Sequence, residues 1–348
     1  MGRADPDPKL DALDRAIVGL LQRNGRMAFR SMAARLGVTE TTVQRRTQQL
    51  LEAGLYRVIG IVDPLQLGQG HAVIIGISSD PPVVHDVAAA LADIPEMRFV
   101  TLVTGTFDVV AELVTSERDR ITRMLTEDLP RIPGVRAINT SWILHNYKTN
   151  YRWEDAAEAL SGDDEAAGLE DGDEPDGDLD TDPDGRTSGA HRGAAASARN
   201  HELDAVDRDI IALLQLNGRM SYAEMAGRLS ITEATARRRT LRLLRSGYVR
   251  VVAVGNPFLL GFQEVVLMWF KVELAQIADV AAALHRLPAV RYLSRTAGAV
   301  DILAEAIFRN RSELFAFLDD TLAGIAGIRD VSISFELRIH KRAYLRFA

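Results

Sequence analysis

The sequence lacks cysteine and long apolar runs. None of its 348 residues is cysteine, which excludes disulfide bonds and thiolate metal sites. No apolar run approaches the ~18 residues of a membrane-spanning helix, and the best candidate, VVLMWF at 265–270, ends at Lys271. The first residues, MGRADPDPKLD, contain no apolar stretch typical of a signal peptide. We therefore expect a cytoplasmic protein with no membrane partner, no metal ion and no other cofactor.

The sequence as a whole also lacks an excess of positive charge, although most of the chain outside one acidic segment has such an excess. The formal net charge is −7. Residues 154–202 hold 16 Asp and Glu against three Arg, a net charge of −13, so the rest of the chain carries +6. The charge of each segment bears on partners more directly than the total does. The acidic total therefore does not exclude a polyanionic partner.

One unit occurs twice in the chain. The stretch LDALDRAIVGLLQRNGRM begins at Leu10, and LDAVDRDIIALLQLNGRM begins at Leu203. The same offset of 193 residues persists without a gap and matches Lys148 with Lys341 near the chain end. Self-similarity at a fixed offset indicates a duplication. We refer to residues 10–153 as copy one and to residues 203–348 as copy two.

Apolar residues at helical spacing predict three helices at the start of each copy. Leu13, Ile17 and Leu21 share one face of the first helix. Asn-Gly at 24–25 and 217–218 is expected to end that helix, and Met32 lies on the inward face of the second.

A tight turn, GVTE in copy one and SITE in copy two, leads into the third helix. Thr39 and Thr232 are placed to cap its start, and Gly54 and Gly247 to end it. Two short helices joined by a tight turn form a helix-turn-helix module, whose second helix enters the major groove of DNA.

The apolar period changes to two after that glycine. YRVIGIVDP and VRVVAVGNP are typical of a strand followed by a proline turn. The rest of each copy predicts the β-α-β-β-α-β order of a ferredoxin-like domain. In copy one these elements are expected at 71–78, 83–94, 98–104, 107–114, 118–129 and 135–144.

We predict an α+β fold: two copies of a three-helix, winged helix-turn-helix domain followed by a ferredoxin-like sandwich domain. The segment 154–202 is acidic and has no aromatic residue, so it is expected to be a disordered linker. The predicted boundaries are 1–9 (tail), 10–56 (helix-turn-helix domain 1), 57–153 (hinge strand and ferredoxin-like domain 1), 154–202 (linker), 203–249 (helix-turn-helix domain 2) and 250–348 (hinge strand and ferredoxin-like domain 2).

The third helix of each copy carries the residues that major-groove reading requires. Arg forms bidentate pairs with guanine, and Gln with adenine. Helical spacing turns Val43 and Ala236 inward and leaves polar residues outside; Arg46 and Arg239 flank the inward face, where phosphate is the more natural contact. The candidate DNA-binding residues are Thr41, Thr42, Gln44, Arg45, Arg46, Gln48, Gln49, Thr235, Arg237, Arg238, Arg239 and Arg242.

The two third helices differ in charge. Residues 39–53 have two Arg and two Glu, whereas 232–246 have five Arg and one Glu, a net charge of +4. We therefore predict that copy two contributes more of the salt-dependent, non-specific affinity for DNA. Ordinary solvated helix faces are the alternative interpretation.

Gly and Asp recur together between two predicted strands, in TGTFDVV at 104–110 and AGAVDIL at 297–303. Glycine there can adopt a positive φ, and turn chemistry alone would explain both residue types. Alternatively, backbone N–H groups and the Asp carboxylate bind the carboxylate and amine of an amino-acid-like effector. The candidate effector residues are Thr104, Gly105, Asp108, Gly298 and Asp301.

Polar residues also end the last predicted strand. His145 and Lys148 in copy one correspond to Arg338 and Lys341 in copy two. We interpret them as solvent-facing residues without a particular role.

The motifs LDxxDRxIxxLLQxNGRM, MAxRL, TExTxxRRTxxLLxxG and TGTFDVV together resemble the Lrp/AsnC (leucine-responsive/asparagine regulator) family, over both copies. The resemblance implies a bacterial-type, nucleoid-associated transcription regulator. It would bind double-stranded DNA through the third helices, sense an amino acid at the Gly-x-x-Asp hairpins and associate through its α+β sheets. The positions carried over as DNA contacts are Thr42, Gln44, Arg45, Arg46, Thr235, Arg237, Arg238 and Arg239.

Members of that family usually carry one unit, so the fusion of two departs from the pattern. We expect the two ferredoxin-like domains to pair within the chain as a pseudo-dimer, and higher oligomers stay open. Thr104 and Phe107 become Ala297 and Val300 in copy two. The two effector sites are therefore expected to be unequal.

Two other functions compete with this one. An effector-independent, chromatin-organising protein would share the architecture. Siroheme decarboxylases resemble the same family but use a His-Asn-Tyr-x-Arg stretch on the second α+β strand, where this chain reads RFVTLVTG and RYLSRTAG. His-Asn-Tyr occurs only at 145–147, on the last strand. We therefore predict that the protein is not an enzyme.

Overall fold

The computed structural model describes residues 10–63, 70–150, 203–343 and 345–346. The predicted tail and acidic linker lie outside these residues. The chain divides into two compact units, and each unit combines parts of both copies. The helix-turn-helix unit holds described residues 10–63 and 203–254, and the α+β unit holds described residues 70–150 and 255–346.

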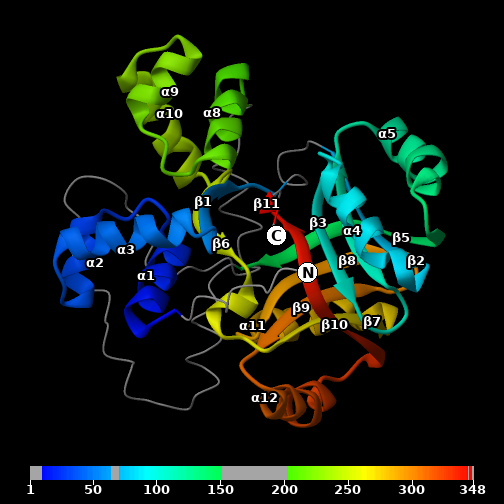
Figure 1. The fold of residues 1–348 in the computed structure, drawn as a ribbon. Helices are drawn as coiled ribbons and strands as arrows, with labels where there is room; N and C mark the ends of the chain where they lie inside the picture. Colours follow the sequence, from blue (N-terminus) through cyan, green and yellow to red (C-terminus); the bar gives the residue numbers. More distant parts are fainter. Residues whose placement is uncertain (1–9, 64–69, 151–202, 344, 347–348) are drawn as a thin grey trace. The chain divides into compact units, whose positions relative to one another are not determined.

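The helix-turn-helix unit contains two sets of three helices (Figure 1). In copy one they are α1 (Ala12–Arg23), α2 (Phe29–Leu36) and α3 (Glu40–Glu52). In copy two they are α8 (Ala205–Leu216), α9 (Tyr222–Leu229) and α10 (Glu233–Arg245). The three helices predicted for each copy are thus present.

The third helices begin at threonine caps and end at glycines, as the sequence predicts. Thr39 Oγ1 accepts the backbone N–H of Thr42 at 3.2 Å, and Thr232 does the same for Thr235. Gly54 and Gly247 follow the last turns with φ of 69° and 72°. Glycine adopts that conformation without a Cβ clash, which ends the helix.

The predicted wing is a single strand in each copy. Strand β1 (Tyr56–Ile61) of copy one pairs with β6 (Arg250–Gly255) of copy two in a two-stranded sheet. Three side chains of β1, Tyr56, Val58 and Ile59, are buried. The two helix-turn-helix domains therefore share one strand pair.

The α+β unit contains the predicted β-α-β-β-α-β order twice. Copy one provides β2 (His71–Ser79), α4 (Val84–Asp93), β3 (Met97–Val103), β4 (Val109–Thr115), α5 (Arg118–Arg123) and β5 (Val135–Thr149). Copy two provides β7 (Glu264–Val272), α11 (Ile277–Arg286), β8 (Val290–Ala297), β9 (Ile302–Phe308), α12 (Arg311–Ala316) and β10 (Ile328–Arg342), followed by the short β11 (Leu345–Arg346).

All strands of this unit belong to one antiparallel sheet. The order is β11-β10-β3-β4-β2-β5-β8-β9-β7, and β10 also pairs with β7. Copy one therefore contributes β3-β4-β2-β5, and copy two β8-β9-β7-β10. The two sets join twice, through β5–β8 (Trp142 opposite Ala297) and through β10–β3 (Glu336 opposite Val103).

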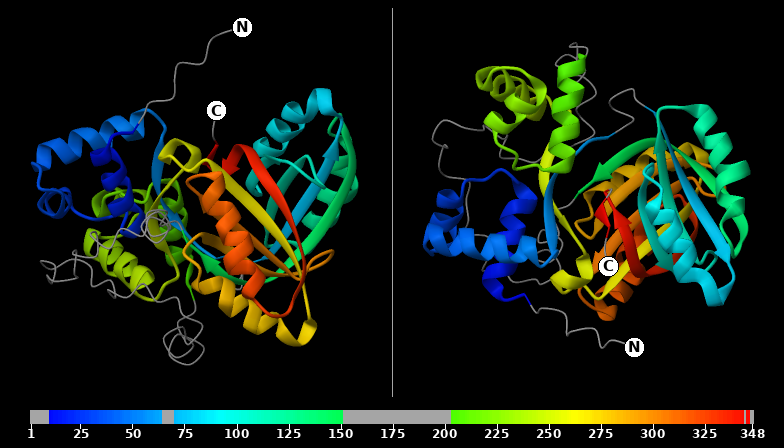
Figure 2. Two further views of the ribbon diagram at one scale, coloured as in Figure 1. Left: turned by 90° about the horizontal axis from the view of Figure 1, so that it is seen from below. Right: turned by 45° about the horizontal axis from the view of Figure 1, so that its top comes forward.

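Three apolar layers hold the α+β unit together. One lies between α4, α5 and the copy-one strands and includes Val73 and Ile75. Its counterpart in copy two includes Met268 and Phe270. The third contains Ile74 with residues of both copies, because alternate side chains of a strand point to opposite faces. Figure 2 shows the helices on the outer faces of the strands.

Two details differ from the sequence prediction. The helix expected at 118–129 is α-helical only over Arg118–Arg123 and continues as a wider π-helical turn over Met124–Asp128, in which Leu129 N–H reaches the carbonyl of Met124. Copy two has the same turn at Phe317–Thr321, so it belongs to the fold. Gly105 has the expected positive φ of 99°, but Gly298 is not among the glycines with positive φ.

Within the described residues, no helix is both long and apolar enough to cross a membrane. The same residues contain no group of three or more His, Asp or Glu side chains arranged to hold a metal ion.

Candidate nucleic-acid interface and effector domain

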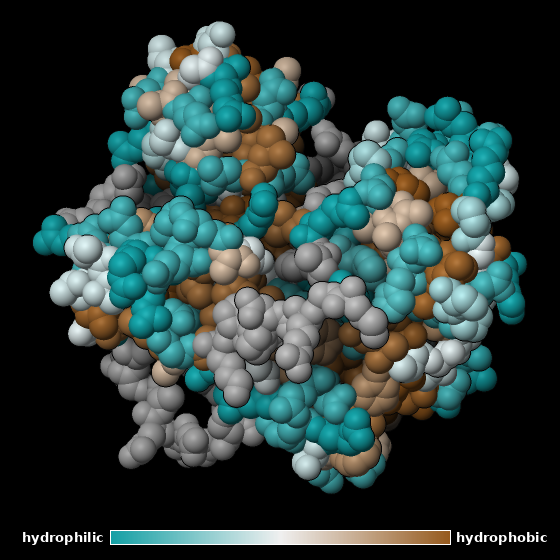
Figure 3. All heavy atoms as spheres, viewed as in Figure 1, coloured by the Kyte–Doolittle hydropathy of each residue, from teal (hydrophilic) through white to brown (hydrophobic). Residues whose placement is uncertain are grey.

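Each third helix buries one face and exposes another. Val43, Thr47 and Leu50 of α3 are buried, and so are their counterparts in α10. Hydrophilic side chains dominate the visible surface over α3 (Figure 3). Of the predicted DNA contacts, Thr41, Gln44, Arg45, Gln48, Gln49, Arg237 and Arg238 are exposed, and Thr42, Arg46, Thr235, Arg239 and Arg242 are half-buried.

The half-buried arginines are held by carboxylates at the start of the first helix, one on its N-cap and one in its first turn. Arg46 Nη1 lies 2.8 Å from Asp11 and 3.2 Å from Asp14. Arg239 Nη1 makes the equivalent contacts with Asp204 and Asp207, at 2.6 and 3.0 Å. These guanidinium groups therefore brace α3 and α10 against α1 and α8, a role that the sequence did not reveal.

The bracing is stronger in copy two. Arg242 Nη2 adds a 2.5 Å contact to Asp207, which is 1% exposed; the counterpart of Arg242 in copy one is Gln49. A hydrogen bond from Arg239 leads the contacts that lower the pKa of Asp204, and in copy one a backbone hydrogen bond from Asp14, with Arg46, lowers the pKa of Asp11. Arg237 and Arg238 are thus the exposed predicted arginine contacts of α10.

The Gly-x-x-Asp hairpins are closed by their own aspartates. Asp108 Oδ2 accepts the backbone N–H of Ser79 at 2.8 Å, and Asp301 Oδ2 accepts that of Val272 at 2.9 Å. These hydrogen bonds fit the turn-chemistry interpretation of both residues. Each aspartate ties its hairpin to the end of the neighbouring strand, β2 or β7.

Both hairpins also touch the last strand of the other copy. Thr104 N–H donates to the carbonyl of Phe335, and Phe335 N–H donates to Thr104 Oγ1, both at 3.0 Å. A Cβ on Gly298 would lie 2.9 Å from the Cα of Ser141. Gly298 therefore serves close approach of two strands rather than a positive φ, which corrects the prediction.

The two hairpins have unequal surroundings. Gly76 leaves room for the ring of Phe107, which a Cβ would meet at 2.7 Å. The counterpart of Gly76 in copy two is Trp269, whose ring lies edge-on to Phe107 with centroids 5.6 Å apart. The copy-two hairpin has the smaller Val300 instead. The packing around the two hairpins is therefore unequal, and unequal effector binding stays a prediction.

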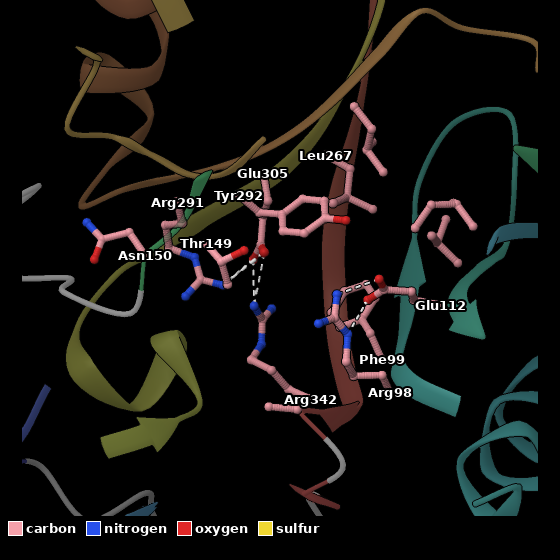
Figure 4. A pocket seen from close by; sticks show the side chains of 14 residues that line it. Arg98, Phe99, Glu112, Thr149, Asn150, Leu267, Arg291, Tyr292, Glu305 and Arg342 are labelled. Carbon is pink, nitrogen blue, oxygen red and sulfur yellow. Dashed lines mark hydrogen bonds and ion pairs between the residues drawn. The ribbon is translucent and has the colours of Figure 1, made fainter. Parts of the chain in front are cut away.

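A cleft of about 580 Å³ lies between the two sets of strands, and this volume includes the solvent at its open mouth (Figure 4). Its apolar wall comes from both copies: Ile74, Val110, Leu267 and Leu303. Its charged wall consists of Arg98, Glu112, Arg291, Glu305 and Arg342. No sequence prediction included these residues. A usable signal was present, because Arg98 and Arg291, like Glu112 and Glu305, occupy the same place of an apolar strand in both copies.

The charges in the cleft are paired. Arg98 Nε donates to Glu112 at 2.8 Å. Glu305 accepts from both Arg291 and Arg342 at 2.8 Å. Burial favours the neutral form of Glu305, but the two guanidinium groups outweigh it and lower its pKa to about 2.

Copy two adds a second carboxylate to this network. Glu336, 4% exposed, accepts from Arg342 Nη2 at 3.1 Å and from Thr101 Oγ1 at 3.2 Å. Burial, together with the charge of Glu305, raises the pKa of Glu336 to about 8. The counterparts of Glu336 and Arg342 in copy one are Ile143 and Thr149, so this charged network is not symmetric.

Lys148 and Lys341 have a role that the sequence analysis did not assign. Lys148 Nζ donates to the carbonyls of His285 and Leu287, at 2.9 and 2.8 Å. Lys341 Nζ donates to the carbonyl of Ile94 at 2.7 Å, and burial lowers its pKa. Each lysine thus caps the C-terminal end of the first α+β helix of the other copy, where unpaired carbonyls favour a cation.

These features define a class of protein: a helix-turn-helix DNA-binding regulator whose recognition helices are joined to paired α+β domains. Family models match both parts in both copies. The AsnC-type helix-turn-helix domain matches residues 10–51 and 203–244, and the Lrp/AsnC ligand binding domain matches 72–153 and 265–345. The chain belongs to the Lrp/AsnC family of transcriptional regulators, and carries its unit twice.

Similar proteins correspond to one copy. An uncharacterised HTH-type transcriptional regulator of Pyrococcus abyssi is 38% identical over 152 residues, which cover 43% of this chain and 96% of that protein. The HTH-type transcriptional regulator FL11 of Pyrococcus horikoshii is 29% identical over 140 residues, 40% of this chain and 92% of its own. Both relatives are archaeal, so the predicted bacterial source stays a prediction.

Solved structures of one similar protein align with both copies. The siroheme decarboxylase NirDL aligns with 95% of this chain and 92% of its own, with a TM-score of 0.55 and 15% identity. At that identity the likeness shows the fold alone.

Proposed function

We propose that one chain binds one stretch of operator DNA with α3 and α10 lying in the major groove, and that it regulates transcription from there. The observation that carries the proposal is the pair of exposed faces, rich in Arg, Gln and Thr, on two third helices whose opposite faces are buried. Base contacts come from the exposed residues of the predicted set. Arg46, Arg239 and Arg242 act mainly by bracing the helices, with phosphate as a second contact.

A selection of genomic fragments by the purified chain, followed by footprinting, tests this proposal. We expect enrichment of a site with two protected half-sites on one face of the duplex. Absence of any enrichment over random fragments at low salt would contradict it. The enriched sites would also separate an operator-specific regulator from a chromatin-organising protein, which would protect long tracts without a common sequence.

The second part of the proposal is that the two copies form an intrachain pseudo-dimer in solution. It is supported by the pairings β5–β8 and β10–β3, and by the reciprocal lysine contacts of Lys148 and Lys341. Light scattering after size exclusion should give the mass of one chain, 38.2 kDa. Obligate pairing of chains would contradict this part while leaving DNA binding intact.

The third part is that an amino-acid-like effector modulates DNA binding at the hairpins of Thr104, Gly105 and Asp108 and of Gly298 and Asp301. It is supported by the match of both α+β domains to the family's ligand binding domain. The unequal surroundings of Phe107 and Val300 favour one effective site per chain. Calorimetry with a panel of amino acids should give a stoichiometry of one, and no heat with any of them would favour an effector-independent protein.

We further propose that the chain is not an enzyme and acts in the cytoplasm, on the nucleoid. The relatives named as transcriptional regulators support this. The siroheme decarboxylase fold supplies the competing hypothesis. An absorbance titration with siroheme discriminates them: a regulator leaves the spectrum unchanged, whereas saturable spectral changes would favour the enzyme.

A further inference from the structure

We propose that Arg26 and Arg219 form a clamp that sets the distance between the two recognition helices, and with it the half-site spacing that the protein accepts on DNA. The inference rests on the proposed function, because it assigns positioning residues to the same DNA-binding unit. The two arginines are counterparts in the two copies. Neither belongs to the third helices, where the DNA contacts are predicted.

Each arginine binds the backbone of the other copy. Arg26 Nη1 donates to the carbonyl of Gly218 at 2.7 Å, and Arg219 Nη1 donates to the carbonyl of Gly25 at 2.8 Å. Each also donates to a second carbonyl two residues further along, at 3.2 and 3.1 Å. Four charged hydrogen bonds thus join the loop that follows α1 to the loop that follows α8.

Each guanidinium group also stacks on the other copy. The Arg26 guanidinium carbon lies 4.9 Å from the ring centroid of Tyr222, and that of Arg219 lies 4.5 Å from the ring of Phe29. Such distances are typical of cation–π contacts. Phe29 and Tyr222 are the first residues of α2 and α9, so the clamp reaches directly into the two helix-turn-helix modules. Burial lowers the pKa of Arg219, as expected for an interior contact.

The glycine of each Asn-Gly-Arg tripeptide permits this approach. Gly25 N–H donates to the carbonyl of Val251, and Gly218 N–H to that of Val58, both at 2.8 Å. A Cβ on Gly25 would lie 2.9 Å from that Val251 oxygen, closer than real Cβ atoms come. Glycine is therefore required for contact with the other copy and not for a left-handed turn, since neither residue is among the glycines with positive φ.

Together these contacts restrict the distance between the recognition helices α3 and α10. The β1–β6 sheet also links the two modules, since Gly60 of β1 packs against Leu214 of α8. A two-stranded sheet is marginally stable alone, so without the clamp we expect the two modules to rock more. The clamp adds four hydrogen bonds and two cation–π contacts between the copies. Its aromatic partners lie on α2 and α9, which contact α3 and α10. Helix-turn-helix pairs read half-sites at a spacing fixed by the distance between their second helices. Loss of the clamp should therefore relax spacing without changing how one helix reads one half-site.

The first test needs no DNA. Because the chain has no cysteine, Thr41→Cys and Ala234→Cys place spin labels at equivalent, exposed positions of α3 and α10. We expect a narrow distance distribution in the otherwise native chain and a broad one in the Arg26→Gln, Arg219→Gln double variant. Arg208→Gln, on the exposed face of α8, is the matched control and should leave the distribution narrow. An equally narrow distribution in the double variant would overturn the proposal.

The second test measures affinity for duplexes whose two half-sites are separated by a series of spacings. The native chain should prefer one spacing. The double variant should lose about fivefold or more at that spacing and bind all spacings alike, because its second helix no longer has a high effective concentration at the second half-site. Its affinity for a single half-site should stay unchanged. The same optimum and width in both proteins would overturn the clamp, and so would an equal loss on single half-sites.

The Arg26→Lys, Arg219→Lys variant covers the case in which the Gln variant does not fold. Lysine can donate to the carbonyls but lacks the planar group that stacks on Phe29 and Tyr222, so we expect an intermediate spread of distances and spacings. Native behaviour of this variant in both tests would overturn the stacking part of the proposal. If the native chain binds no duplex while the spin-label result is as expected, the proposed function fails and the clamp stands.

Discussion

Removal of two exposed arginines from α10 should change the salt dependence of DNA binding more than removal of one from α3. Arg237 and Arg238 are exposed, whereas Arg239 and Arg242 contact the carboxylates of Asp204 and Asp207. The counterparts of the exposed pair in copy one are Gln44 and Arg45. Arg237→Gln with Arg238→Gln therefore compares directly with Arg45→Gln, and each change leaves two Gln at the same place.

The magnitude follows from counterion release. Each phosphate contact contributes about 0.9 to the slope of log affinity against log salt concentration. On non-specific DNA, where these side chains meet phosphate, the copy-two variant should lose about 1.8 in slope and the copy-one variant about 0.9. Between 50 and 200 mM salt, a change of 1.8 makes the copy-two defect about tenfold smaller at the higher concentration.

Fluorescence anisotropy with a random duplex, measured at several salt concentrations, gives these slopes directly. Arg329→Gln, an exposed arginine of the α+β unit, serves as the control for loss of charge and should change neither slope. On the selected operator the copy-two variant should also lose about 1–3 kcal/mol for each guanine that an arginine reads. Slopes and affinities equal to those of the native chain on both duplexes would refute the assignment of α10 to DNA.

Three further outcomes concern the α+β unit. The free energy of unfolding should fall as the pH rises from about 5 to 8, because Glu336 has its pKa raised from 4.5 to about 8 and is neutral in the fold. In urea titrations at several pH values, Glu336→Gln should flatten that decline. Parallel curves of unfolding free energy against pH for the two proteins would contradict the shift. Lys341→Met removes a charged hydrogen bond to the carbonyl of Ile94, made by a residue that is 5% exposed. It should cost about 1.5–3 kcal/mol of unfolding free energy. A loss no larger than that of Arg329→Met would show that the cap is unimportant. Gly76→Ala places a Cβ 2.7 Å from the ring of Phe107. The overpacking should cost about 1–3 kcal/mol of unfolding free energy and lower the midpoint of thermal unfolding. A stabilised protein would contradict the packing.

Local patterns in the sequence predicted most of the fold. The third helix shows why: its period, its Thr39 cap and its terminal Gly54 all act within one short segment, so each leaves a local signal. The ferredoxin-like order was predicted for the same reason, since each strand and helix has its own period. The helix expected at 118–129 failed at its end, because apolar spacing does not distinguish an α-helical turn from the wider turn that follows Arg123.

Contacts between the copies left no such signal. The sequence predicts a solvent-facing Lys148, yet this lysine caps a helix of copy two 137 residues away. The first helix ends at Asn24 as predicted, but no local pattern shows that the N–H of Gly25 donates to the carbonyl of Val251. Even within copy one, the period of the third helix shows only that Arg46 flanks the inward face, and not that it meets Asp11 and Asp14. A side chain's own segment does not show which distant backbone it will meet, and the duplication indicates only that such contacts come in pairs.

The proposed function requires that a single chain supplies both recognition helices to one DNA site. Native mass spectrometry of the protein with its selected operator counts chains per duplex directly. We expect one 38.2 kDa chain on each duplex, with both half-sites protected in the matching footprint. Two chains on every duplex, with a lone chain never bound, would contradict it.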